Sequence, residues 1–496
     1  MIETGSEVAS LVREAALVTG RASGIGRAIV EHFLDDMDVK RMKRLWSNRV
    51  GRAVSAPAQA SRLIIPLAIA ALIASACSST TKPSSTTAST SSSTTTTASS
   101  QRTPRGAPSP GVTATTVNVG QVDDLTLPIS GLFKGAQDGT QAYFDYVNSL
   151  GGVNGRKIKL DAQDSAYSNG VVANNTAAQI KNDFALVGGF SLDDAAEEPL
   201  IASAKMPDVA YPLDPELSNL PASYSPVPNN DNDFSTTIFK VLKKKFPQII
   251  KHVGILWANA TPSTVLAEKA FERGMKSQGF KIVYDAGFTP SQTTFLANVL
   301  TMKARGVQLF FAQALPDAYA ATVAKEMQQQ NFHPINVEAD AYSANLIKEG
   351  GAAVNGMYIE IGYLLYLGAD GHLPAVKLFT KWMKKADPSA NFELQALFGW
   401  AAAQLFVEGL RNAGSPPTRA SLEAALNKIT SFSASGLITT SDPAHNVPGS
   451  CVILAQVQNG NVVRVSPTPK SGFFCLPGSL LPAPGFKPEI RPAPRS

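Results

Sequence analysis

From residue 117 onward, short apolar runs alternate with longer segments in which apolar positions recur every three or four residues. Short apolar runs bounded by glycine and polar residues indicate buried strands, and the longer spacing indicates amphipathic helices. In the segment 132–151, the helical spacing is carried by Ala136, Ala142, Tyr143, Tyr146 and Val147. Strands that alternate with helices predict parallel sheets joined by crossover helices.

The expected elements form two α/β series, one on each side of residue 231. The first series has strands at 116–122, 184–189 and 208–213, another after the glycine-rich turn at 151–155, and helices at 132–151, 171–183 and 194–206. The second series has strands at 252–258, 281–288, 307–313 and 335–340, and helices at 234–249 and 264–279. Further helices at 375–386, 393–414 and 418–429 precede a β-rich end at 451–467. This order predicts an α/β fold with two doubly wound parallel-sheet lobes around a ligand cleft.

The two series set the expected domain organisation. We expect the first lobe to comprise residues 111–230 with 356–435, and the second to comprise 231–355 with 436–475. Two flanking segments differ in composition. Residues 78–110 are rich in Ser, Thr and Pro and are expected to form a disordered linker, and residues 476–496 are expected to form a Pro-rich tail. Such compositions bury too little apolar surface to fold.

An uncharged apolar run at 63–76 follows a basic stretch that begins at Met37. The run is too short for a comfortable membrane span and has the length of a signal-peptide core. Small residues precede Cys77, as a lipoprotein signal peptidase requires, although Ala74 stands where leucine is usual. An uncleaved anchor or a chance apolar stretch is the alternative. We expect 37–77 to be a lipoprotein signal peptide with Cys77 lipidated.

The chain has three cysteines, an odd count that an exported protein must accommodate. Lipidation of Cys77 leaves Cys451 and Cys475 to form a disulfide in an oxidising compartment. Closing a loop of that size would contribute roughly 3 kcal/mol through the unfolded state. Two buried free thiols are the alternative.

The charge distribution excludes one class of partner. The formal net charge is +5, of which +3 belongs to residues 1–77, so the globular part carries no large basic face. Nucleic-acid binding therefore has no compositional support. The five histidines show no metal-ligand spacing, and no cofactor is expected.

A glycine-rich turn near the start, "TGRASGIG" at 19–26, resembles the cofactor-binding turn of short-chain dehydrogenases/reductases. That family also needs a complete sheet and a Tyr-x-x-x-Lys pair, and no tyrosine of this chain is followed four residues later by lysine. A lone glycine turn is weak evidence. We expect residues 1–36 to be a non-functional remnant, with translation starting at Met37 or Met42. An NAD(P)-dependent dehydrogenase stays as the remote alternative.

The stretch "AYFDYVNSLGGVNGRKIKL", residues 142–160, resembles the signature of type I solute-binding proteins of ABC importers, branched-chain (hydrophobic) amino-acid-binding family. The order of elements from about 111 to 475 also matches. The resemblance implies two lobes that close on a small ligand, an amino acid or a related amide or organic compound, and deliver it to an ABC permease. It implies no catalysis, a monomer, and an exported protein that the lipid on Cys77 anchors at the outer face of the cytoplasmic membrane. A ligand-sensing receptor subunit with the same fold is the alternative.

Ligands of such sheets bind at the carboxyl ends of the strands, which selects candidate residues. In the first lobe the resemblance implies that Ser191 and Leu192 meet the ligand, because this loop supplies hydroxyls and helix-end amides to a ligand carboxylate. Asp193 and Asp194 follow and would repel a carboxylate unless they point away. Asp214, after Leu213, takes a place where relatives often have an Ala-Thr pair. These departures argue against a simple branched-chain amino acid.

In the second lobe, loops after expected strands supply the remaining candidates. The candidate ligand contacts are Trp257, Asn259, Gln313, Asp340 and Tyr342. Asp340 would pair with a ligand ammonium, and Tyr342 would close over its body. Core packing is the alternative for Trp257, and helix capping is the alternative for Asp193, Asp194 and Asp317.

Overall fold

The computed structural model describes residues 109–126, 133–228, 233–339, 341–390, 392–467 and 472–482. All of them belong to one compact unit, Ser100–Ser496. The dehydrogenase-like segment 1–36, the expected signal peptide 37–77 and nearly all of the expected linker lie outside these residues. None of the described helices combines the length and apolarity needed to cross a membrane.

The first sheet is entirely parallel, with the strand order β2-β1-β3-β4-β5. Its strands are β1 (Thr116–Asp123), β2 (Lys157–Asp164), β3 (Leu186–Val187), β4 (Asp208–Val209) and β5 (Ser223–Tyr224). The reversal of strand order beside β1 is the topology that the alternating sequence predicts. It gathers the carboxyl ends of β1, β2 and β3 at one edge.

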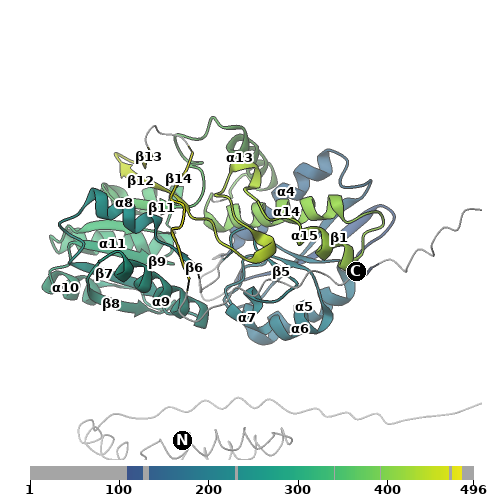
Figure 1. Ribbon diagram of the computed structural model, residues 1–496, viewed down its shortest axis with the longest axis horizontal. Coiled ribbons are helices and arrows are strands. Elements are labelled where there is room, and N and C mark those ends of the chain that lie inside the picture. The colour runs from purple at the N-terminus through teal and green to yellow at the C-terminus, as the bar shows by residue number, and fades with distance from the viewer. Residues whose placement is uncertain are drawn as a thin grey trace, which may run out of the picture. The chain divides into compact units, whose positions relative to one another are not determined.

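Helices from two distant parts of the chain cover the first sheet. The early ones are α4 (Lys134–Ser149), α5 (Asn169–Asn182), η1 (Asp194–Ala196), α6 (Glu198–Ala204) and α7 (Pro215–Ser218). The late ones are α13 (Pro374–Ala386), α14 (Leu394–Asn412) and α15 (Arg419–Leu426). Figure 1 shows α14 and α15 beside α4, and α14 makes the most extensive packing of any helix pair with α4. The late helices thus complete the first lobe's core.

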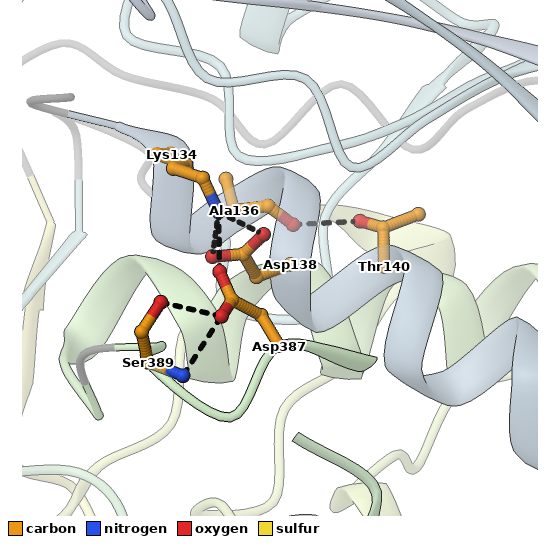
Figure 2. Close-up of polar contacts among 6 residues, drawn as sticks. All are labelled: Lys134, Ala136, Asp138, Thr140, Asp387 and Ser389. Carbon is orange, nitrogen blue, oxygen red and sulfur yellow. Dashed lines mark hydrogen bonds and ion pairs between the residues drawn. The ribbon is translucent and has the colours of Figure 1, made fainter. Parts of the chain in front are cut away.

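An exposed ion-pair cluster also joins α4 to the segment after α13. Lys134 Nζ lies 2.6 Å from an Asp138 carboxylate oxygen and 3.0 Å from Asp387 Oδ2. Asp387 in turn accepts hydrogen bonds from the backbone N–H and hydroxyl of Ser389, as Figure 2 shows. These bonds hold the pKa of Asp387 down, to about 2, with a further contribution from Lys134.

The second sheet has the order β13-β12-β11-β10-β9-β7-β8, with β14 paired to β12. Strands β7 to β11 run parallel, whereas β12 is antiparallel to β11, β13 and β14. The bounds are β7 (Val253–Ala258), β8 (Ile282–Phe288), β9 (Leu309–Gln313), β10 (Ile335–Glu338), β11 (Tyr358–Ile361), β12 (Cys451–Gln458), β13 (Asn461–Ser466) and β14 (Phe474–Cys475). The second lobe's sheet is therefore mixed, not purely parallel, because a hairpin closes its end.

Both faces of the second sheet are covered, as in a doubly wound fold. Helices α8 (Thr237–Lys245) and α9 (Pro262–Ser277) pack on one face with Ile255 and Phe311. The other face packs against α10 (Leu296–Ala304), α11 (Asp317–Gln329), α12 (Ala344–Gly350) and η2 (Gly351–Val354). Figure 1 shows α8, α9, α10 and α11 around β7, β8 and β9.

The path between the lobes differs slightly from the expected boundaries. The expected return to the first lobe at 356 precedes β11, which pairs with β10 and β12 in the second sheet. The chain therefore reaches the first lobe's helices only after Ile361. The expected Pro-rich tail begins with β15 (Leu480–Pro482), which pairs with β6 (Asp233–Ser235). Two short turns, η3 (Ala434–Gly436) and η4 (Pro443–His445), precede β12.

The expected disulfide between Cys451 and Cys475 is present. The two residues are direct partners in the β12–β14 pairing, with 4.1 Å between their Cα atoms. The bond therefore fastens the last described strands to the second sheet.

Candidate functional site

One buried carboxylate collects the polar groups at the carboxyl ends of the first three strands. Asp124, directly after β1, accepts a hydrogen bond from the Ser191 hydroxyl at 2.7 Å on Oδ1. The Ser165 hydroxyl, after β2, also donates to Oδ1, and the Leu192 N–H donates to Oδ2 at 2.8 Å. Asp124 is only 1% exposed. Three donors from two loops therefore converge on one side chain.

A second carboxyl group, Asp123, lies beside this cluster at the end of β1. It accepts hydrogen bonds from the Phe190 N–H at 3.0 Å and from the Gln121 amide at 3.2 Å. Burial raises the pKa of Asp123 well above its ordinary range, and the negative charge of Asp124 adds to the effect. Two adjacent acidic side chains thus make this edge unfavourable for a further negative charge.

The acidic residues after β3 do not cap the short helix that they begin. The Asp193 side chain makes no capping hydrogen bond, and the Asp194 carboxylate accepts from the backbone N–H groups of Leu213 and Asp214. Asp194 therefore ties the loop after β3 to the loop after β4. Burial raises its pKa to about 8.

Asp214, a candidate ligand contact, has a local structural partner. It is the N-cap residue of α7, and its carboxylate accepts a hydrogen bond from the Leu217 N–H at 3.0 Å. An aspartate in this position stabilises the first turn of a helix. The observed contact is thus a helix cap, and any ligand contact by Asp214 stays a prediction.

The second lobe contributes a strand-end group of its own. Gln313 is the last residue of β9 and is half-buried. Asp317 follows at the start of α11, where the Ser343 hydroxyl donates to its carboxylate. Burial raises the pKa of Asp317 to about 6. The candidate Asp340 lies outside the residues that the structure describes.

Tyr342 belongs to a packed group of tyrosines and is 1% exposed. Its ring centroid lies 4.7 Å from that of Tyr366 and 5.9 Å from that of Tyr363. The Tyr366 hydroxyl donates to the Tyr342 carbonyl at 2.8 Å, and the Leu367 N–H donates to the Tyr342 hydroxyl at 2.9 Å. Tyr342 thus packs in the core, with its hydroxyl already engaged.

Trp257 lies in β7 and Asn259 directly follows it, and both contact the neighbouring strand β8. Trp257 packs with the core on the α8 and α9 face, and its Nε1 donates to Asp285 Oδ1 at 2.8 Å. The Asn259 N–H donates to the Phe288 carbonyl at 2.7 Å, and the residue is exposed. The Trp257 contacts agree with the core-packing interpretation, because they lie on the covered face of the sheet.

Groups from both lobes influence one another electrostatically. Tyr167, two residues after Ser165, has its pKa raised first by burial and then by Asp193, Asp124 and Tyr319. Tyr319 is part of α11 in the second lobe, where its hydroxyl donates to the Pro290 carbonyl. We define the strand-end site as the set Asp124, Ser165, Tyr167, Ser191, Leu192, Asp193 and Tyr319.

The sequence reasoning missed several members of this site. Asp124, Ser165, Tyr167 and Tyr319 were not among the candidates. The strand-end rule that selected Ser191 also points to Asp124, since "VDDL" ends the first strand. The signal was therefore available at β1 and β2 and was applied only to later strands.

The family of the chain follows from comparison with known proteins. The family model described as "Periplasmic binding protein" matches residues 116–461, more than half of the chain. The chain belongs to the periplasmic binding protein family. Proteins of this family bind small-molecule ligands outside the cytoplasm and work with ABC permeases. No curated protein matches the chain.

Solved structures of periplasmic binding proteins share the fold. A fatty acid ABC transporter substrate-binding protein from Thermomonospora curvata is 19% identical with a TM-score of 0.64, over 78% of this chain and 99% of that one. A branched-chain amino acid transporter substrate-binding protein from Streptococcus pneumoniae, in complex with isoleucine, is 18% identical with a TM-score of 0.58, over 71% and 100%. A leucine binding protein from Thermotoga maritima is 17% identical with a TM-score of 0.58, over 71% of this chain and 98% of that one. The match covers 116–461, so the dehydrogenase-like segment lies outside it.

Proposed function

We propose that this periplasmic binding protein is the exported substrate-binding component of an ABC importer, anchored to the membrane by a lipid on Cys77. It binds one small ligand between its two lobes, closes around it and delivers it to a permease. It acts as a monomer and performs no catalysis. Transport rather than sensing is the role that we assign.

The observation that carries this proposal is the strand-end site itself. Tyr319 of the second lobe, together with Asp193 and Asp124 of the first, raises the pKa of Tyr167 beyond the larger effect of burial. A ligand held there would touch both lobes and would therefore favour a closed arrangement, because only differential binding shifts such an equilibrium.

An aromatic stack next to Ser191 supplies an apolar surface for the ligand body. The Phe190 ring is stacked on Tyr211 with 5.3 Å between centroids, and Tyr211 is stacked on Phe398 with 4.4 Å. Relatives with this fold include a fatty acid transporter's binding protein and a protein in complex with isoleucine. We therefore infer a ligand with an apolar body and a polar head, such as an amino acid or a related amide or organic compound.

Thermal unfolding against a panel of amino acids, amides, polyamines and small organic acids tests the proposal. A true ligand at one hundred times its Kd stabilises the native state by about 2.7 kcal/mol, which gives a visible rise in Tm. Small-angle X-ray scattering should show a smaller radius of gyration with the same compound. A compound that raises Tm without compaction would contradict lobe closure.

A matched pair of variants tests the place of binding. Tyr167→Ala removes a side chain of the strand-end site, and we expect the Kd to rise roughly tenfold or more because a contact residue is truncated. Tyr146→Ala is the control: it also truncates a tyrosine, but one in α4, whose ring packs against Trp382 with 5.8 Å between centroids. The control should leave Kd unchanged. Equal effects on Kd would place binding elsewhere, and a Tm response to NADPH alone would favour the dehydrogenase alternative.

A further inference from the structure

We infer that the carboxylate of Asp124 occupies the hydrogen-bond donors of the first lobe's strand-end loops. The ligand therefore binds there through an N–H group and not through a carboxylate. The inference rests on the proposed function for its site. It names the class of ligand head group: an ammonium or an amide.

Three donors at this edge, the hydroxyls of Ser165 and Ser191 and the N–H of Leu192, are engaged by the chain itself. A serine hydroxyl carries one hydrogen, and a backbone amide carries one. The hydrogens of Ser165, Ser191 and Leu192 all point to the Asp124 carboxylate. An incoming carboxylate would find none of them available unless Asp124 were displaced.

The two hydroxyl oxygens are also used as acceptors, which fixes their orientation. Ser191 Oγ accepts a hydrogen bond from the Asp193 N–H at 3.1 Å, and Ser165 Oγ accepts one from the Tyr167 N–H at 3.0 Å. Each hydroxyl is therefore held between a backbone donor and Asp124. Rotation of either hydroxyl hydrogen toward a ligand would break its bond to Asp124, and a buried group that loses its partner is costly.

Acceptor capacity, in contrast, is left over at the same edge. A carboxylate accepts about four hydrogen bonds, and Asp124 receives three from the described residues. The buried oxygen Asp193 Oδ2 has no hydrogen-bond partner among the residues that the structure describes. A ligand N–H group would supply the missing donor.

The electrostatic balance points the same way. The pKa of Asp193 is raised first by burial and then by the charge of Asp124. A second anion at this site would meet like charges, whereas an ammonium would be attracted and an amide would be tolerated.

The first experiment compares ligands that share one side chain and differ in the head group. Leucinamide, N-acetylleucinamide, leucine and N-acetylleucine are titrated into the full-length protein, and Kd is measured by calorimetry. We expect the two amides to bind at least about tenfold more tightly than the two carboxylates, because like charges are avoided. Comparing the Kd of leucinamide with that of N-acetylleucinamide shows whether the site prefers an ammonium or a neutral amide. Tighter binding of leucine than of leucinamide would overturn the inference.

The second experiment removes the internal carboxylate and needs no knowledge of the natural ligand. Asp124→Ala frees the three donors, so millimolar isovalerate should raise the Tm of this variant and leave wild type unchanged. Asp208→Ala is the matched control, because Asp208 is 2% exposed in the same sheet and accepts only from the Ser223 hydroxyl among the described donors at 3.1 Å. If Asp124→Ala does not fold, Asp124→Ser replaces it.

The two experiments separate failure of this inference from failure of the proposed function. A Tm rise with isovalerate in the Asp124 variant and not in the Asp208 variant supports the internal carboxylate, even when wild type binds none of the leucine compounds. Equal responses of the two variants, or a response of wild type to isovalerate, would overturn it. The proposed function fails separately, when no compound of the wider panel stabilises or compacts the wild-type protein.

Discussion

Gly139 of α4 lies directly against the backbone carbonyl of Ala396 in α14. A Cβ atom on Gly139 would be 1.9 Å from that oxygen, far inside van der Waals contact. The relation is reciprocal, because a Cβ on Gly399 would be 2.0 Å from the Ala136 carbonyl oxygen. The two helices, distant in sequence, therefore meet backbone to backbone, and only glycine permits that approach.

Gly139→Ala should destabilise the protein by about 1–3 kcal/mol or more, because the new methyl group must push the helices apart. Urea unfolding gives the change in free energy. Gly170→Ala is the control: it lies in the first turn of α5, and its nearest heavy atom is 3.9 Å from the added carbon. Alanine there should be neutral or stabilise by roughly 0.5–1 kcal/mol. Similar losses in both variants would contradict the steric explanation.

A buried ion pair gives the second prediction. Arg464 of β13 pairs with Asp370, and their side chains are 0% and 3% exposed. Asp370 also accepts the Leu365 N–H at 2.8 Å, so it fixes the turn after β11. Arg464→Ala should cost about 3–5 kcal/mol of unfolding free energy, because it leaves an uncompensated buried charge.

Lys134→Ala is the control for the ion pair. Lys134 also contacts carboxylates, as Figure 2 shows, but its side chain is 49% exposed. Solvent screening limits such pairs to about 0–1 kcal/mol. Guanidinium denaturation of both variants measures the difference. Equal costs would mean that burial does not set the strength of these pairs.

Stability should fall as pH rises from about 4 to about 8. Burial raises the pKa of Asp194 to about 8 and that of Asp208 to about 7, from an ordinary value of 3.8. The folded state therefore keeps protons that the unfolded state has released, and unfolding becomes easier as pH approaches the folded-state pKa. Each unit of difference between the folded-state and unfolded-state pKa corresponds to about 1.4 kcal/mol of unfolding free energy.

Asp194→Asn tests the source of that dependence. Its carbonyl oxygen still accepts from the backbone N–H groups of Leu213 and Asp214, while the titrating proton is lost. Urea unfolding at pH 5 and pH 8 should show a smaller loss in the variant than in wild type. An unchanged difference between the two pH values would assign the effect to other groups.

The disulfide gives the fourth prediction. Replacing Cys451 and Cys475 by serine should lower the unfolding free energy by roughly 3 kcal/mol, because the closed loop no longer restricts the unfolded chain. Dithiothreitol should lower wild-type stability by a comparable amount and should not affect the double variant. A reductant effect of equal size in the double variant would exclude the disulfide as its cause.

Local patterns in the sequence predicted the elements well where their signals are short-range. The alternation of apolar runs and helical spacing located β1, α4, β7 and α9 within a few residues. The turn between β12 and β13 consists of Asn459 and Gly460, both with positive φ, which is the pair that a two-residue hairpin favours. Propensity and periodicity act within a few residues, so a single chain reveals them.

The candidate site was less accessible to such reasoning. Ser191 and Leu192 were found because they follow a strand. Trp257 was selected by the same rule, yet it lies within β7 and packs on the α8 and α9 face. Tyr342 likewise is enclosed by other tyrosines. Position after a strand selects a neighbourhood, and packing from the covering helices decides whether a side chain is enclosed.

The sequence by itself determined the α/β class, the two series of elements, the cysteine pair and the resemblance to a solute-binding family. The tertiary structure decided which donors remain for a ligand. Asp124 and Ser191 are 67 residues apart, and Asp124 and Ser165 are 41 apart. Their hydrogen bonds exist only because the parallel topology brings three strand ends together. No local pattern encodes that meeting, and so the occupation of the donors by Asp124 became visible only in the folded chain.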